Sequence, residues 1–108
     1  MPFKKVGALL LKLDGQIVFA STFFCDLVGI SHEKVAGQSY FDFVFPEDMD
    51  AARKLLETNV RPHDPLRLRL LRLDGTEIET DVQPVPVLTA EGDVYAITAI
   101  VTVANDSR

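Results

Sequence analysis

The sequence is poor in the residues and patterns on which several large classes of function depend. Its 108 residues include one cysteine and no tryptophan. One cysteine excludes an intrachain disulfide and gives no sign of an oxidising compartment. No apolar run reaches the roughly 18 residues of a membrane-spanning helix, and no basic segment precedes a short apolar run as in a signal peptide. We therefore predict one cytoplasmic domain, residues 1–108, without direct membrane contact, which also suits the cytoplasmic part of a membrane receptor.

Signatures of catalysis are missing as well. There is no Gly-x-Ser-x-Gly word, no metal-ligand spacing and no glycine-rich phosphate loop. His32 and His63 are far apart in polar surroundings, which is typical of surface histidines. Cys25 lies among apolar residues and beside Asp26, whereas a reactive thiol needs positive charge nearby. We predict no enzymatic activity; a small enzyme would need a perturbed carboxylate or histidine in a cleft.

The net charge of the chain excludes some classes of binding partner. The net charge of −5 repels nucleic acid and anionic membrane, so neither is predicted as a partner. Arg67 and Arg69 are a local exception, and they alternate with leucines, so both lie on one face of a predicted strand. We interpret that face as solvated; the alternative is a contact with an acidic partner or a coiled-coil linker.

What the sequence does contain is a set of strong turn signals. Asp14-Gly15 separates two extended apolar runs, 6–13 and 16–20, and predicts a β-hairpin, because glycine supplies the positive φ of a tight turn. Alternation places Ile17 and Phe19 on one face of the second strand, which we assign to the core, and Val18 on the other.

The middle of the chain favours short helices. Ser21 is a suitable N-cap for a helix that ends at Gly29. Pro46 suits the first position of the longest predicted helix, 46–59. A second short helix is predicted at 32–36, and a short, aromatic-rich turn at 39–45.

Three more strands are predicted after these helices, at 65–73, 76–88 and 94–103. Pro84 and Pro86 cannot donate to a sheet ladder, so the second of these strands should be open along that stretch or carry a bulge. The fold class is thus α+β: a five-stranded antiparallel sheet with short helices packed on one face. The strand at 6–13 is predicted to be central, with 94–103 beside it.

Five short sequence motifs, in this order along the chain, resemble those of the PAS domain over roughly residues 5–106. They are LDGQI (13–17), FCDLVGIS (24–31), VAGQ (35–38), FPED (45–48) and RLDGT (72–76). The resemblance implies a sensory or regulatory module of a larger, bacterial signal-transduction protein. Such parents include sensor histidine kinases of two-component systems, cyclic-dinucleotide enzymes and transcription regulators, in which the module relays its state to an effector domain.

The resemblance also bears on cofactors. Flavin-binding LOV-type members place a reactive cysteine at the position that Tyr40 occupies, and haem-binding members use a histidine within the long helix. The stretch 46–59 holds no histidine, and His63 lies beyond it. We therefore predict no metal, no haem and no LOV-type flavin. Family members that hold flavin noncovalently often place a tryptophan near its ring, and the absence of tryptophan disfavours this option but leaves it open. An unidentified small organic ligand is a further option.

A cluster of aromatic residues between 40 and 45 has two interpretations. It either fills the core, as aromatic side chains commonly do, or lines a ligand pocket between helices and sheet. In the second interpretation Tyr40 is the polar handle of the ligand. The candidate pocket residues are Tyr40, Phe41, Phe43, Leu56, Thr80 and Thr98. The alternative function is a ligand-free PAS module for protein interaction and dimerisation.

The predicted last strand, 94–103, has apolar residues on both of its faces. One of these faces must point away from the helices, onto what we call the outer face of the sheet. An exposed apolar patch on a small domain usually meets a partner. PAS domains commonly dimerise through this face, so the resemblance implies a homodimer.

Overall fold

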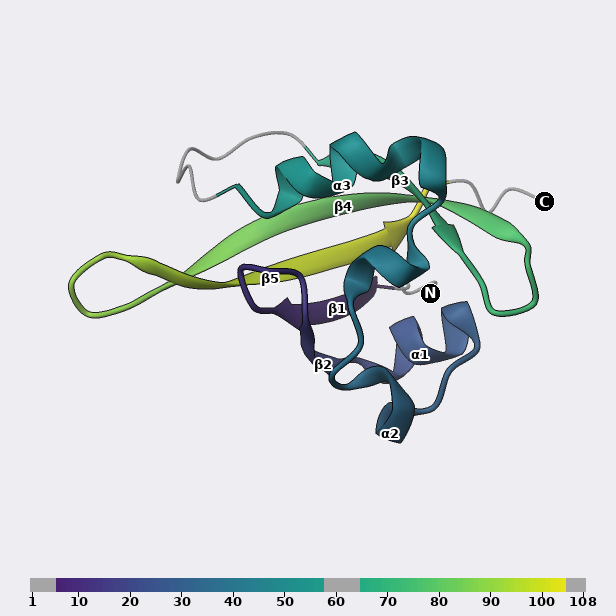
Figure 1. Cartoon of the computed structure of the whole chain (residues 1–108), viewed down its shortest axis with the longest axis horizontal. Helices are drawn as coiled ribbons and strands as arrows, with labels where there is room; N and C mark the ends of the chain where they lie inside the picture. The colour runs from purple at the N-terminus through teal and green to yellow at the C-terminus, as the bar shows by residue number, and fades with distance from the viewer. Residues whose placement is uncertain (1–5, 58–64, 105–108) are drawn as a thin grey trace, which may run out of the picture.

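A five-stranded antiparallel sheet organises the protein, seen in a computed structural model that describes residues 6–57 and 65–104 (Figure 1). The strands lie in the order β2-β1-β5-β4-β3, which confirms the predicted fold class. β1 is an inner strand beside β5, as predicted, but β5 rather than β1 takes the middle position. The strands span Val6–Leu11 (β1), Ile17–Ala20 (β2), Leu66–Leu71 (β3), Glu77–Leu88 (β4) and Val94–Val103 (β5).

The helical insertion between β2 and β3 is made of short pieces. They are α1 (Thr22–Val28), α2 (His32–Val35), the 3₁₀ turns η1 (Tyr40–Phe43) and η2 (Pro46–Asp48), and α3 (Met49–Leu55). The predicted long helix at 46–59 is therefore a 3₁₀ turn followed by a helix that ends at Leu55, and residues 58–64 lie outside the described part of the chain. Residues 44 and 45 are extended, because Val44 pairs with Leu70 and the Phe45 amide donates to the Arg69 carbonyl at 2.8 Å.

The first helix is tied to the sheet at its start. Ser21 is its N-cap, and the Ser21 Oγ accepts from the amides of Ala8 at 3.0 Å and Phe24 at 3.4 Å. One hydroxyl thus joins β1 to α1, and it satisfies an amide that the first helical turn leaves free. Gly29 ends the helix with φ = 87°, a left-handed conformation that glycine adopts without strain.

The core lies between the helices and one face of the sheet. Leu9 pairs with Ala99 and Leu11 with Ile97, so these four side chains share the inner face, and all are buried. Helix α1 covers them with Phe24, Cys25 and Val28, and further buried members come from β2, α2, η1, α3, β3 and β4. The opposite, outer face carries Ala8, Leu10, Val85, Thr98 and Ile100.

A β-bulge in β2 overturns the prediction that Phe19 belongs to the core. Leu10 pairs with Phe19 and Leu11 with Ile17, so Val18 is an extra residue without a partner. The bulge interrupts the alternation of faces. Ile17 is buried as predicted, but Phe19 joins Leu10 on the outer face and is 56% exposed.

The second half of β4 is open on one side, as its prolines predict. β3 pairs with β4 only as far as Val82, whereas Pro84 and Pro86 pair with β5 on the other side. Prolines on a free edge have no amide hydrogen to offer another strand, which protects this edge from pairing with a second chain. Beyond this point β4 and β5 continue as a long hairpin (Figure 1).

Replacement of Phe43 by alanine should destabilise the fold by about 3–5 kcal/mol, because it removes a buried ring and leaves a void. Phe43 is 2% exposed and packs edge-on against Phe24, with ring centroids 6.0 Å apart. The matched control is Phe19→Ala, which removes the same ring from an exposed position and should cost less than about 1 kcal/mol. Equilibrium urea denaturation gives both values; equal losses would contradict the two burial assignments.

Candidate functional site

Two of the aromatic residues predicted for the pocket are part of the packed core. The Tyr40 ring is buried, and its hydroxyl donates to the Ala52 carbonyl oxygen in α3 at 2.6 Å. Burial raises the pKa of Tyr40, so the hydroxyl stays protonated and keeps this hydrogen bond. Phe41 lies against Tyr40 with ring centroids 4.9 Å apart, and Phe43 lies beside Phe24. These contacts are those of core residues.

Leu56 and Phe41 meet at the β1–β2 turn. A Cβ atom on Gly15 would lie 2.9 Å from the Phe41 Cε2 and 3.4 Å from the Leu56 Cδ1. Gly15 also has φ = 95° and accepts from the Tyr40 amide at 2.9 Å. Glycine is therefore required here twice, by the turn and by the close approach of the helical insertion.

The two threonines predicted for the pocket lie on opposite faces of the sheet. Thr80 is fully buried on the inner face, and its hydroxyl donates to the Leu68 carbonyl oxygen at 2.8 Å. Thr98 pairs with Leu10 and Val85 on the outer face, so its placement in a pocket under the helices is wrong. The pairing register decides the two faces, because it sets Thr98 opposite Leu10 and Thr80 opposite the buried Leu68. Five of the six predicted residues thus lie on the helix side of the sheet: Tyr40, Phe41, Phe43, Leu56 and Thr80. Thr98 lies on the opposite side.

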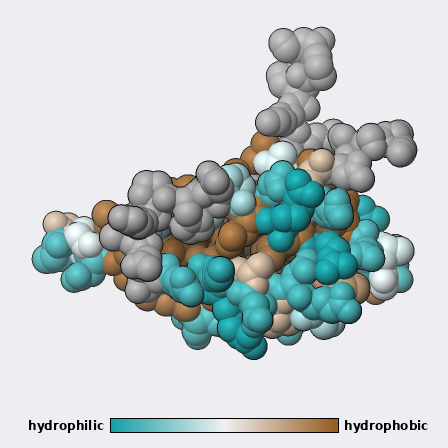
Figure 2. All heavy atoms as spheres, turned by 90° about the horizontal axis from the view of Figure 1, so that it is seen from above, coloured by the Kyte–Doolittle hydropathy of each residue, from teal (hydrophilic) through white to brown (hydrophobic). Residues whose placement is uncertain are grey.

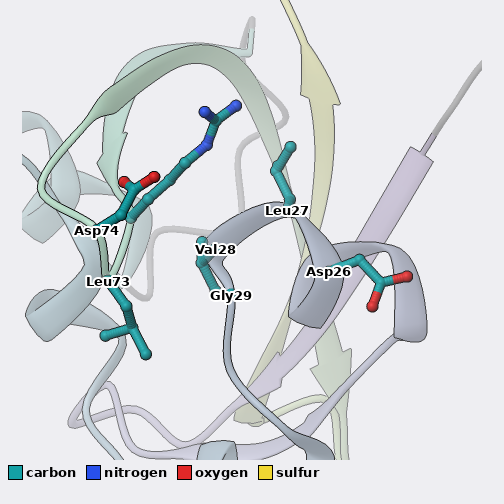
Figure 3. Close-up of a pocket in the computed structure, with 7 residues that line it drawn as sticks. Asp26, Leu27, Val28, Gly29, Leu73 and Asp74 are labelled. Carbon is teal, nitrogen blue, oxygen red and sulfur yellow. The ribbon is translucent and has the colours of Figure 1, made fainter.

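A first surface cleft, of about 440 Å³, lies where the end of α1 meets the β3–β4 turn (Figure 3). The Leu73 amide donates to the Val28 carbonyl at 3.0 Å and holds the two walls together. Arg72 contributes the only buried side-chain nitrogen or oxygen in the described part of the chain without a hydrogen-bond partner, its Nε. Asp26 and Asp74 also line the cleft, so its charge is net negative and disfavours an anion.

A second cleft, of about 590 Å³, lies on the outer face. Its walls come from the end of β1, the β1–β2 turn, β2 and the start of β5, and most of its surface is apolar. It is lined by Leu10, Lys12, Leu13, Asp14, Val18, Tyr95 and Ala96. Sequence reasoning missed this cleft, although it placed Val18 correctly on the outer face. None of the pocket residues predicted from the sequence lines either of these two clefts.

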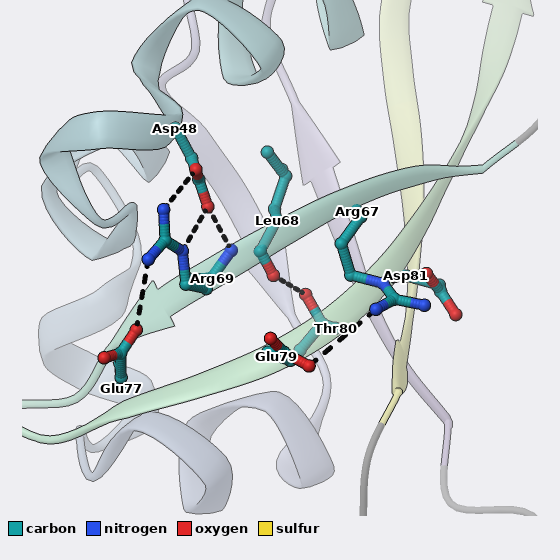
Figure 4. A network of polar contacts seen from close by, with 8 residues as sticks. All are labelled: Asp48, Arg67, Leu68, Arg69, Glu77, Glu79, Thr80 and Asp81. Atoms are coloured by element: carbon teal, nitrogen blue, oxygen red, sulfur yellow. Dashed lines mark hydrogen bonds and ion pairs between the residues drawn. The ribbon is translucent and has the colours of Figure 1, made fainter.

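The arginines of β3 have carboxylate partners within the chain (Figure 4). The Arg67 Nε donates to the Asp81 Oδ1 at 2.7 Å. Asp48 accepts from the Arg69 amide at 2.8 Å, from its Nε at 3.0 Å and from its Nη2 at 2.9 Å. The Arg69 guanidinium also lies 4.5 Å above the Phe45 ring centre. Arg69 is thus a structural residue that joins the start of α3 to the edge of β3, rather than a solvated surface charge.

The remaining titratable candidates show no catalytic arrangement in residues 6–57 and 65–104. Burial, and secondarily the neighbouring Asp26, raise the pKa of the Cys25 thiol, which disfavours the reactive thiolate. His32 is exposed and lies 3.2 Å from the Thr22 hydroxyl, while His63 falls outside the described residues. Within the same ranges no three His, Cys, Asp or Glu side chains are grouped as metal ligands, and no helix is long and apolar enough to cross a membrane.

Residues 5–103 match the family model described as the PAS fold. The C4-dicarboxylate transport sensor protein DctS of Rhodobacter capsulatus is 33% identical over 93 residues, which are 81% of this chain and 14% of that protein. The PAS domain of a protein from Colwellia psychrerythraea superimposes with a TM-score of 0.81 at 18% identity, covering 94% of this chain and 88% of that chain. The PAS domain of an HTR-like protein from Haloarcula marismortui gives a TM-score of 0.74 at 20% identity, covering 91% and 80%.

The sheet order, the helical insertion and the family match lead to one conclusion: the chain belongs to the PAS family. This confirms the resemblance found in the sequence. The solved structures are less than 25% identical to the chain and show the fold alone. The chain spans about one seventh of DctS, so the activity of that whole protein is not carried over with the family.

Asp48→Asn should lower the free energy of unfolding by about 1–2 kcal/mol at neutral pH, because it removes the charge that accepts three hydrogen bonds from Arg69. Those bonds lower the pKa of Asp48 from its usual 3.8. A lowered folded-state pKa means that the contribution is complete above the unfolded-state pKa and is lost as pH falls through the folded-state value. The gap between wild type and variant should therefore shrink on acidification.

The control for this pH dependence is Asp50→Asn. Asp50 pairs with Arg53 at 2.9 Å, but its side chain is almost fully exposed. Its loss should cost less than about 0.5 kcal/mol. Urea denaturation from neutral pH to about pH 3 measures both variants, and a cost for Asp48→Asn that does not change with pH would contradict the assigned role of its charge.

Proposed function

We propose that this PAS domain is a regulatory module of a bacterial signal-transduction protein and that it acts through the outer face of its sheet. In this role it forms a homodimer and relays its state to an effector domain of the same or a partner protein. The observation that carries the proposal is the exposure of apolar side chains on that face. Val18, Phe19, Val85 and Tyr95 are each 45–59% exposed.

The distribution of charge supports the outer face as an interface. Its β3–β4 end carries the ion pair of Arg67 with Asp81, whereas its β1–β5 part carries Leu10 and Ile100 next to the exposed apolar residues. An apolar area beside a polar border is the usual composition of a protein interface. Figure 2, which views the molecule from the top of Figure 1, shows that apolar atoms also reach the surface between polar side chains on that side.

Of the two PAS functions left open by the sequence, the packing favours the interaction module. The hydroxyls of Tyr40 and Thr80 are both donated to backbone carbonyls, so neither is a spare polar handle for a ligand. Phe43 is in edge-to-face contact with Phe24. A small-ligand sensor with its site between helices and sheet stays a prediction; it would require these core residues to move apart.

The parent protein is proposed from the relative rather than from the fold. DctS is named as a sensor, and this chain matches a small part of it. A sensor histidine kinase is accordingly the parent we favour over the other classes. We propose no catalytic activity for the domain itself, and the cytoplasmic location remains a prediction from the sequence.

Sedimentation velocity across a range of concentrations tests the homodimer. The wild-type protein should show a concentration-dependent monomer–dimer equilibrium. Val85→Glu should weaken the dimer about tenfold or more, because it would bury an unpaired charge within the interface. Leu73→Glu is the control, since Leu73 is even more exposed but lies in the β3–β4 turn, away from the outer apolar area. A strictly monomeric wild type at high concentration would refute the proposal.

A further inference from the structure

Two irregularities of the sheet meet at one place on its outer face. In β2, Val18 has no partner because Leu11 pairs with Ile17 and Leu10 with Phe19. In β5, Tyr95 has no partner because Leu88 pairs with Val94 and Val87 with Ala96. Both unpaired residues, from strands separated by β1, line the second cleft. Bulges change the direction of side chains and are often found beside functional sites. Two bulges that place their extra residues in the same cleft therefore indicate a binding site.

The cleft combines apolar walls with one cation. Leu10, Leu13, Val18 and Tyr95 supply the apolar surface. The cation is Lys12, two residues after Leu10 in the sequence. Within the described residues its ammonium group forms no ion pair.

The cleft is also lined by the carboxylate of Asp14, which is bound within the β1–β2 turn. The Asp14 Oδ1 accepts from the Gln16 amide at 3.0 Å, so this group caps the hairpin turn. Asp14 keeps its negative charge, so Lys12 and Asp14 leave the cleft without net charge. Lys12 is the one cation that lines it and the side chain that can donate to the anionic end of a ligand with an apolar body.

We propose that this cleft binds a small amphipathic monocarboxylate, with its apolar chain between Val18 and Tyr95 and its carboxylate at the Lys12 ammonium. The volume of about 590 Å³ lies within the range of small-molecule sites. The site differs from the pocket predicted under the helices, because it lies on the other face of the sheet. It goes beyond the proposed homodimer, since its ligand is a small molecule, but Val18 and Tyr95 belong to both surfaces, so octanoate and a second copy of the chain would compete for them.

Titration of the ¹⁵N-labelled protein with octanoate, below the concentration at which octanoate forms micelles, tests the site by NMR. Saturable shifts are expected at the amides that line the cleft, among them those of Val18, Tyr95 and Ala96. Lys12→Met keeps the apolar stem and removes the charge, so it should weaken octanoate about threefold. The control is Lys34→Met, at an exposed position of α2 away from the cleft, which should leave the affinity for octanoate unchanged. Octan-1-ol should bind wild type and Lys12→Met equally.

A pair of valine variants separates the cleft from the rest of the outer face. Val18 and Val85 are 46% and 45% exposed, and Val85 does not line the cleft. Val18→Glu should weaken octanoate about tenfold or more, because it places a carboxylate beside the apolar chain and the ligand's own charge. Val85→Glu should not weaken octanoate binding, although it is the variant expected to weaken the dimer. The two proposals can therefore fail independently.

Four results would overturn the binding site. They are the absence of saturable shifts at the cleft, shifts at Tyr40 and Phe43 in their place, equal losses for Val18→Glu and Val85→Glu, or an unchanged affinity for octanoate in Lys12→Met. If Val18→Glu weakens the dimer and the wild-type protein does not bind octanoate, the occupant of the cleft is a protein side chain rather than a small carboxylate.

Discussion

The position of the helical insertion depends on the interaction of Asp48 with Arg69. The Asp48 carboxylate, which is 18% exposed, accepts from both the backbone and the guanidinium of Arg69. It thereby satisfies an amide on the edge of β3 and fixes the point at which α3 begins. α3 then supplies the Ala52 carbonyl to Tyr40 and the side chains that cover β3. Charge-assisted hydrogen bonds of this kind are stronger than neutral ones, which suits a junction between two elements far apart in sequence.

A consequence of this anchoring is that the two faces of the sheet have different properties. On the inner face the aromatic cluster packs against α1 and α3, and the hydroxyl groups of Tyr40 and Thr80 both donate to backbone carbonyls within the chain. On the outer face, residues from β1, β2 and β5 leave apolar surface exposed and form a cleft. In the function that we propose, a signal enters or leaves through the outer face, and the core then does not need to open. The inner face would provide stability and the outer face recognition.

Much of the fold could be predicted because its signals are local. Asp-Gly turns mark the β1–β2 and β3–β4 hairpins, Ser21 and Gly29 delimit α1, and Pro84 and Pro86 indicate the open edge of β4. Each of these depends on a residue and its immediate neighbours. The candidate site was predicted less well, since a pocket is made by residues that are distant in sequence. Thr98 was assigned to the wrong face, and the cleft beside Lys12 was not foreseen.

The sequence by itself determined the class of fold, the family and the order of the elements, because turn residues and apolar periodicity act over a few positions of the chain. Only the tertiary structure decided which face each side chain of β2 and β5 occupies. Alternation holds as long as every residue in a strand has a partner, and the bulges at Val18 and Tyr95 break that condition. A bulge arises from the fit between two paired strands and their turn, so a single strand carries no sign of it. For this reason Phe19 is exposed on the outer face although its own strand predicts a buried ring.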